Sequence, residues 1–65
     1  MFVIVNGKRQ QMSEPLTLAA LLLALSPRGP FAVARNNEFI PRCLYNDCVV
    51  EPGDNIDIIQ PTVGG

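Results

Sequence analysis

The sequence predicts an α+β fold in which a single helix packs on one face of a mixed sheet of four to five strands. Short segments rich in β-branched and aromatic residues alternate with turn signals, which is typical of strands. One segment, residues 17–25, has instead the leucine and alanine composition of a helix. A chain of 65 residues has room for one domain. Packing one helix across one face of the sheet is the simplest way to bury the apolar side of the helix and the apolar face of the sheet. We expect residues 1–60 to form that domain and residues 61–65 to form a flexible tail.

The chain begins with a predicted β-hairpin. Phe2–Val5 combines aromatic and β-branched residues. Asn6-Gly7 follows and is a strong signal for a type I′ turn, because both central residues of that turn have positive φ. Lys8–Met12 is therefore expected to return as a second strand, and its polar composition places it at a sheet edge before Ser13-Glu14-Pro15 ends it.

Residues 17–25 are predicted to form the helix. Thr17 is a suitable N-cap, and the Pro- and Gly-containing stretch 26–30 ends the helix. Leucines spaced by three and four residues share one face of it, namely Leu18, Leu21, Leu22 and Leu25. Leu23 adds apolar surface outside that stripe, so we expect the helix to be covered on much of its circumference.

The second half of the chain contains three more predicted strands, 31–35, 38–40 and 55–60. Asn36-Asn37 is expected to turn the first of these into the second. Pro41 cannot donate a ladder hydrogen bond, so the second strand is short or lies at an edge. The stretch 43–49 has no clear pattern and is compatible with one turn of helix, and Pro52-Gly53 forms a strong turn before the last strand.

Composition excludes several classes of function. The net charge is −1 and the basic residues are scattered, so no basic patch for nucleic acid is expected. The chain has no His, and so small a domain has no room for a deep pocket beside its core, so we expect neither a self-contained enzyme nor a metal site. Two cysteines are too few for a disulfide scaffold, which favours a cytoplasmic location.

The apolar run 16–25 invites two membrane interpretations. It has ten residues, whereas a bilayer span needs about 20, so we expect no membrane segment. Together with Lys8-Arg9 and Ala32-Val33-Ala34 it also imitates a signal peptide, but a strand-like segment precedes the basic pair, which disfavours that interpretation.

Two other groups of residues could carry chemistry. Cys43 and Cys48 are interpreted as small, partly buried apolar residues, with a disulfide or a regulatory thiol as the alternative. Glu51, Asp54 and Asp57 are interpreted as solvated turn and strand residues, and the alternative is that they steer the docking of a basic partner.

Strand alternation predicts a partner-binding patch. If Val3 and Val5 face the core, Phe2 and Ile4 lie on the opposite sheet face, where Ile59 can join them. The alternative is that a loop covers these side chains. The expected patch consists of Phe2, Ile4, Ile59 and Val63.

The chain ends in Gly64-Gly65. Two residues without a Cβ make a narrow end that can enter a channel and present the terminal carboxylate to another protein. A carboxylate reacts with a sulfur or nitrogen nucleophile only after activation, for example by adenylation. The alternative is a frayed terminus without a function.

Several segments of this chain together resemble the ThiS family of sulfur carrier proteins, which has the ubiquitin-like β-grasp fold. The resemblance covers nearly the whole length, and its motifs are specific in combination rather than singly. The segments that carry it are Val3-Ile4-Val5-Asn6-Gly7, Leu16-Thr17-Leu18, 33–42 with its Asn-x-Glu-x-x-Pro-Arg pattern, Pro52-Gly53-Asp54, Ile56–Ile59 and Val63-Gly64-Gly65.

The resemblance implies a protein co-substrate rather than an enzyme. A ThiF-like enzyme would use ATP and Mg²⁺ to adenylate the carboxylate of Gly65, and a persulfide donor would convert it to a thiocarboxylate. Thiazole synthase would then receive the sulfur for the thiazole half of thiamine. Gly65 would carry the sulfur and Gly64 would provide clearance for the tail, while the chain itself would bind no cofactor and be a monomer when free.

Three alternatives remain open at this point. A MoaD-like small subunit of molybdopterin synthase also ends in Gly-Gly, although the Asn-x-Glu-x-x-Pro-Arg segment favours the ThiS type. A passive interaction module would bind partners without tail chemistry. A ubiquitin-like conjugator would form stable bonds to lysine.

Overall fold

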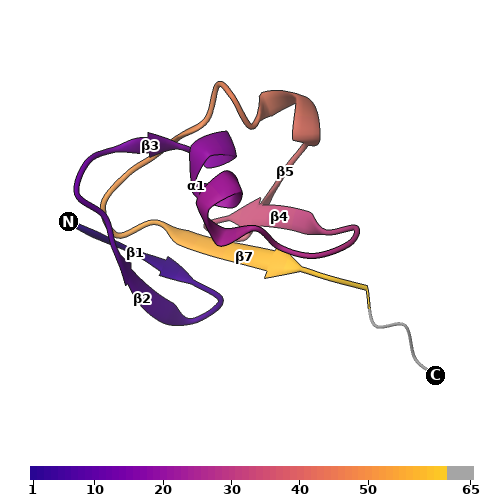
Figure 1. Cartoon of the computed structure of the whole chain (residues 1–65), viewed down its shortest axis with the longest axis horizontal. Coiled ribbons are helices and arrows are strands. Elements are labelled where there is room, and N and C mark those ends of the chain that lie inside the picture. The colour runs from indigo at the N-terminus through magenta and orange to yellow at the C-terminus, as the bar shows by residue number, and fades with distance from the viewer. Residues whose placement is uncertain (62–65) are drawn as a thin grey trace.

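The computed structural model describes residues 1–61 and shows a helix packed on one face of a mixed sheet (Figure 1). Five strands follow one another across the sheet in the order β2-β1-β7-β4-β5. β1 and β7 are parallel, and the other neighbouring pairs are antiparallel. The predicted α+β class with one helix on a mixed sheet is therefore confirmed, and the arrangement is that of a β-grasp fold. Of the predicted tail, residues 62–65 lie outside the described part.

The N-terminal hairpin forms as predicted. β1 (Phe2–Val5) pairs with β2 (Lys8–Gln11), and φ is 50° at Asn6 and 82° at Gly7, so both turn residues have the positive φ of a type I′ turn. All four residues of β2 are exposed, which confirms an edge strand. The strand ends one residue earlier than predicted, at Gln11. Met12 is buried in the core, and its N–H still bonds the Met1 carbonyl across the hairpin at 2.8 Å.

The helix α1 (Leu18–Leu25) is capped as predicted, because Thr17 Oγ1 accepts a hydrogen bond from the Ala20 N–H at 3.1 Å. It ends at Ser26, which adopts a left-handed conformation with φ 48°. Three leucines of the predicted stripe are buried and the fourth is half-buried. The expectation that the helix is covered on much of its circumference does not hold at Leu23, which is 80% exposed, because no element within residues 1–61 packs over it.

The remaining strands follow the predicted order. β4 (Ala32–Arg35) turns through Asn36 and Asn37, both with positive φ, into the short edge strand β5 (Glu38–Ile40). A 3₁₀ helix, η1 (Arg42–Leu44), provides the predicted helical turn and begins one residue before the predicted stretch. The last strand, β7 (Asn55–Ile59), lies in the middle of the sheet between β1 and β4.

A second, two-stranded sheet was not predicted. β3 (Leu16–Thr17) pairs antiparallel with β6 (Val49–Val50), just before the helix begins. The Leu18 N–H then bonds the Cys48 carbonyl at 2.7 Å, which ties the first turn of α1 to the same segment. Two-residue strands carry too little alternation to be recognised in a sequence, so their pairing depends on the rest of the fold.

The core lies between α1 and the sheet. Five side chains have no exposed surface and come from the hairpin, the helix, the sheet centre and the small second sheet: Val3, Leu18, Val33, Val50 and Ile56. Phe31, Ile40 and Tyr45 pack against this cluster from the β4–β5 side. Because β7 supplies Ile56 to the middle of the core, the strand that leads to the chain end belongs to the best-packed part of the domain.

Candidate functional site

β7 holds the chain up to the point from which the tail continues. It bonds to β1 on one side and to β4 on the other, with Ile59 opposite Ala32 in the last register pair. The Asn6 side chain extends the β1 side, because its Oδ1 accepts a hydrogen bond from the Ile58 N–H at 2.8 Å. Gln60 Nε2 donates to the Arg28 carbonyl at 2.5 Å. The last described hydrogen bond of the chain end is therefore at Gln60.

Gly64, Gly65 and Val63, which the sequence predicts to be functional, lie outside the described residues. The described part ends at Pro61, and Figure 1 shows β7 running out of the sheet toward that end of the molecule. The structure therefore describes the part of the molecule from which residues 61–65 continue, and we call this part the platform. That platform has two parts, a polar network before β7 and an apolar surface beside its end.

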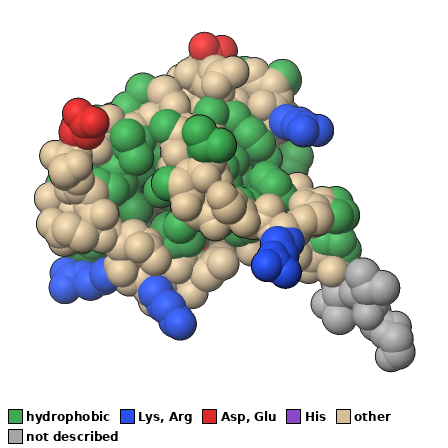
Figure 2. Space-filling view, viewed as in Figure 1, with side chains coloured by type: hydrophobic (Ala, Val, Ile, Leu, Met, Phe, Trp, Pro, Cys, Tyr) green, Lys and Arg blue, Asp and Glu red, His purple; other side chains and the backbone are tan. Residues whose placement is uncertain are grey.

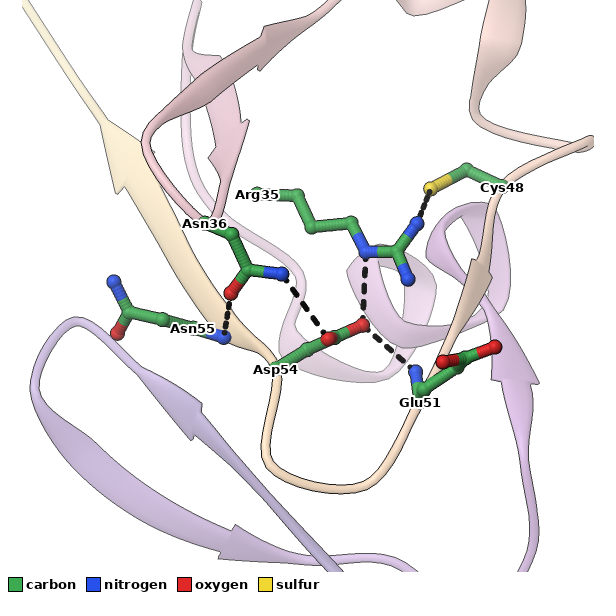
Figure 3. Close-up of polar contacts among 6 residues, drawn as sticks. All are labelled: Arg35, Asn36, Cys48, Glu51, Asp54 and Asn55. Atoms are coloured by element: carbon green, nitrogen blue, oxygen red, sulfur yellow. Dashed lines mark hydrogen bonds and ion pairs between the residues drawn. The ribbon is translucent and has the colours of Figure 1, made fainter.

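The polar network is centred on Asp54, which precedes β7 and is 8% exposed (Figure 3). Its carboxylate accepts hydrogen bonds from Arg35 Nε at 2.8 Å and from the Glu51 N–H at 2.8 Å, both at Oδ2, and from Asn36 Nδ2 at 3.2 Å at Oδ1. Asn36 Oδ1 in turn accepts from the Asn55 N–H at 2.9 Å. The network thus joins the β4–β5 turn to the turn before β7 and sets the position of the first residue of β7.

Charge is balanced within this network. Burial by itself raises the pKa of Asp54, but the hydrogen bonds from Glu51 and Asn36 and the guanidinium of Arg35 outweigh it and hold the pKa below its ordinary value. Burial likewise lowers the pKa of Arg35, but the hydrogen bond to Asp54, the negative charge of Asp54 and the contact with Cys48 together raise it above its ordinary value. Asp54 and Arg35 are therefore an ionised pair, and every acceptor has a donor.

These contacts correct one prediction. Asp54 is not a solvated turn residue but the buried centre of a network, whereas Glu51 is exposed and Asp57 is half-buried. The sequence could not separate these three carboxylates, because the partners of Asp54 lie up to 19 residues away. The segments that carry the family resemblance include Arg35, Asn36 and Asp54, and in the structure these three side chains are joined by hydrogen bonds.

The two cysteines are both free thiols. Cys48 is half-buried, as predicted, and its Sγ lies 3.6 Å from Arg35 Nη1 (Figure 3). The prediction of partial burial is wrong for Cys43, which is exposed at the middle of η1. Within residues 1–61, no group of three or more cysteine, aspartate or glutamate side chains lies close enough together to hold a metal ion.

The predicted apolar patch is divided in two. Val3 and Val5 face the core, as expected, and Phe2 and Ile4 lie on the opposite face, where both are half-buried. Ile59 is on that same face and is 57% exposed.

Polar residues separate the two halves of the patch. Asn55 is opposite Ile4 and is followed on the same face of β7 by Asp57, so Ile59 is not continuous with Ile4. Arg9 further covers the hairpin half, with its guanidinium carbon 4.2 Å from the centre of the Phe2 ring. The neighbours of Ile59 are instead Ala32 and Ala34, and across β4 the side chain of Phe39, which is 64% exposed.

No helix within the described residues is long and apolar enough to cross a membrane.

Comparison with known proteins gives consistent matches. The crystal structure of the thiamine biosynthesis protein ThiS from Geobacter metallireducens has a TM-score of 0.87 to this chain at 29% sequence identity, with both chains covered completely. A solution structure of a thiamine biosynthesis protein from the same organism has a TM-score of 0.81 at 29% identity and covers 100% of this chain and 88% of that one.

Matches at the level of sequence agree with the structural ones. A thiazole synthase from Paramagnetospirillum magneticum is 34% identical over 67 residues, which cover 100% of this chain, and the chain spans 20% of the length of that curated relative. The model of the ThiS family matches residues 3–65, from the first strand through the terminal Gly-Gly. The chain therefore belongs to the ThiS family.

Proposed function

We propose that this chain is the sulfur carrier for the thiazole half of thiamine, with its terminal carboxylate as the carrying group. One observation supports this most directly: the match to the ThiS family continues through Gly64-Gly65, the residues proposed to carry the sulfur. The two structural matches to thiamine biosynthesis proteins support the same role.

In the proposed reaction the carboxylate of Gly65 attacks the α-phosphorus of ATP held with Mg²⁺ by a ThiF-like enzyme, and pyrophosphate leaves. A persulfide sulfur then displaces AMP from the acyl-adenylate. A thiol cleaves the resulting sulfur–sulfur bond, so that Gly65 retains one sulfur as a thiocarboxylate and the other sulfurs leave as a disulfide. The acid, base, metal and nucleotide of these steps all belong to the partner, in accordance with the absence of His from the chain.

This chain contributes the length of its tail and a narrow end without side chains. Five residues, 61–65, follow the hydrogen bond at Gln60, and fully extended they span at most about 18 Å. A partner must therefore bring its reactive centre within that distance of the end of β7. Gly64 and Gly65 have no side chains, so the last part of that reach can pass through a narrow channel.

Thiazole synthase is the proposed recipient of the sulfur. The support is the Paramagnetospirillum magneticum protein of that name, in which a segment matching this whole chain makes up one fifth of the length. We further propose that the chain acts in the cytoplasm as a free monomer and binds no cofactor itself.

The proposal is tested by intact-mass spectrometry of the carrier after incubation with a ThiF-like enzyme, MgATP and a persulfide donor. The expected result is a mass increase equal to the exchange of one oxygen for sulfur, located at Gly65 by fragmentation. Deletion of Gly65 should abolish the exchange while the fold, measured by circular dichroism, remains unchanged. An unmodified carboxylate with active enzyme would contradict the proposal.

A second measurement separates the alternatives. The loaded carrier should transfer its sulfur to thiazole synthase and not to the large subunit of molybdopterin synthase. Transfer only to the latter would assign the chain to the MoaD type, and a Gly65 deletion that leaves every function intact would indicate a passive module.

A further inference from the structure

The antiparallel ladder between β4 and β7 has a regular hydrogen-bond pattern. At its far end the Asn36 N–H bonds the Asn55 carbonyl at 2.8 Å, so these two residues form a hydrogen-bonded pair in the register of the two strands. In an antiparallel ladder such pairs recur at every second position. Counting along the register in steps of two ends on another hydrogen-bonded pair, Ala32 with Ile59, which is also the last pair of the ladder.

Two prolines occupy the next hydrogen-bonded position beyond this pair. One further step of two residues along each strand places Pro30 opposite Pro61. A hydrogen-bonded pair needs an N–H group from each of its residues, and proline has none. Both hydrogen bonds that would continue the ladder are therefore absent, which explains why it ends at Ala32 and Ile59.

Two neighbouring features prevent the segment before β4 from acting as a strand. Gly29, directly before Pro30, has a φ of 66°, which lies outside the extended region of a β-strand. The carbonyl of Arg28, the next acceptor in the register, receives the hydrogen bond from Gln60 Nε2 at 2.5 Å. A side chain thus takes the place of the backbone donor that a longer ladder would bring to this carbonyl.

On the other side of β7 the pairing also ends within a residue of the same point. β1 ends at Val5, and Asn6 belongs to the hairpin turn, where its Oδ1 accepts the hydrogen bond from the Ile58 N–H. Both prolines are exposed, and Figure 2 shows hydrophobic side chains, a class that includes proline, at the surface beside the end of the described chain. The chain therefore leaves the sheet directly after Ile59.

We propose that Pro30 and Pro61 are positioning residues for the chain end: by ending the ladder at Ile59 they set how many residues can extend to a partner enzyme. This inference rests on the proposed function, in which the carboxylate of Gly65 must reach the partner's reactive centre. If residue 61 were paired, only residues 62–65 would follow, and they span at most about 14 Å instead of about 18 Å. The role is the same for every enzyme that receives the chain end.

The first test is amide hydrogen exchange of the double variant Pro30→Ala/Pro61→Ala, which supplies both missing N–H groups. The new amides at positions 30 and 61 should exchange at least about tenfold more slowly than amides of an unpaired chain, because they form the next pair of the ladder. The matched control is Pro15→Ala/Pro52→Ala, which replaces two other exposed prolines outside this ladder and makes the same change to the unfolded chain. Exchange of both new amides at the unpaired rate would overturn the inference.

The second test is the adenylation kinetics of the same variants, measured as ATP–pyrophosphate exchange by the ThiF-like enzyme at saturating ATP. The double variant should raise KM for the carrier about threefold or more and leave kcat unchanged, because molecules in which residue 61 is paired do not bind productively. The control variant should keep the wild-type KM. A fall in kcat with an unchanged KM would indicate a merely structural role and would overturn the inference.

A rescue experiment separates the length of the chain end from other effects of the two substitutions. Insertion of one glycine after position 61 of the double variant restores the number of residues beyond the extended ladder. KM should then return to near the wild-type value while the amides at positions 30 and 61 remain protected. A KM that stays raised after the insertion would show that length is not what the two prolines set.

Failure of this inference can be told apart from failure of the proposed function. If the wild-type chain is adenylated and loaded with sulfur, and the double variant has protected new amides but an unchanged KM, only the positioning role is wrong. If active enzyme does not adenylate the wild-type chain, the proposed function is wrong. The exchange measurement needs no partner, so in that case it still decides whether Pro30 and Pro61 end the ladder.

Discussion

At the scale of the residue, Asp54 shows how one carboxylate organises two distant turns. It collects three hydrogen bonds from the β4–β5 turn and from its own turn, and it lies directly before the first residue of β7. A buried carboxylate is unfavourable unless its oxygens are bonded and its charge is paired, and here both conditions are met. The network is therefore expected to stabilise the fold rather than to react.

We predict that Asp54→Asn lowers the free energy of unfolding by about 1.5–3 kcal/mol at pH 7. The variant loses the negative charge that pairs with Arg35, and its NH₂ group, which replaces one carboxylate oxygen, cannot accept the hydrogen bonds that this oxygen accepted. The pKa of Asp54 is lowered in the folded state, so its contribution is present above about pH 4 and is lost as pH falls through the folded value. The difference between wild type and variant should therefore shrink in acid, as urea titrations at several pH values will show.

Glu51→Gln is the matched control for that variant. Glu51 takes part in the network through its backbone N–H, and its side chain is exposed. The substitution should change stability by less than about 0.5 kcal/mol. A similar loss for both variants, or a loss for Asp54→Asn that does not depend on pH, would show that the network lacks the proposed role.

At the scale of the element, the first hairpin turn also holds β7. Asn6 tolerates the φ of 50° that the turn requires, and its side chain accepts the hydrogen bond from Ile58. The parallel β1–β7 ladder has two register pairs, at Ile4 and Val5, so this side-chain bond extends it. One residue thereby forms the hairpin and secures the strand that leads to the chain end.

We predict that Asn6→Gly costs about 1 kcal/mol of unfolding free energy, because glycine keeps the positive φ and removes the bond to Ile58. Asn37→Gly is the control: it has a φ of 68°, and within the described residues its side chain makes no hydrogen bond. Amide hydrogen exchange should show faster exchange at Ile58 in Asn6→Gly alone. Equal exchange at Ile58 in wild type and both variants would contradict the assignment.

At the scale of the whole molecule, stability is limited by size. A chain of 65 residues is expected to have about 3–10 kcal/mol of unfolding free energy at ~0.05–0.15 kcal/mol per residue. The core between α1 and the sheet contains few side chains, and Ile56 of the central strand is completely buried among them. The strand β7 is therefore both the element from which the tail continues and a central part of the core.

We predict that Ile56→Ala costs about 2–5 kcal/mol, enough to unfold a substantial fraction of the protein, because it leaves a cavity in the middle of the core. Ile59→Ala makes the identical change on the same strand at a side chain that is 57% exposed, and should cost less than about 0.5 kcal/mol. Urea denaturation compares the two. Equal losses would show that β7 is not packed as described.

The sequence by itself determined the order of the helix and the five strands of the main sheet, the two asparagine turns, the cap at Thr17, the inward face of β1 and the presence of Gly64-Gly65. Each of these depends on a residue and its near neighbours in the chain, through allowed φ values, capping and alternation. The tertiary structure decided the burial of Asp54, the exposure of Leu23, the pairing of β3 with β6 and the division of the apolar patch. Those features depend on residues far apart in the chain, such as Arg35 beside Asp54. The exposure of Leu23 depends on which elements pack around the helix, and no local sequence pattern contains that information.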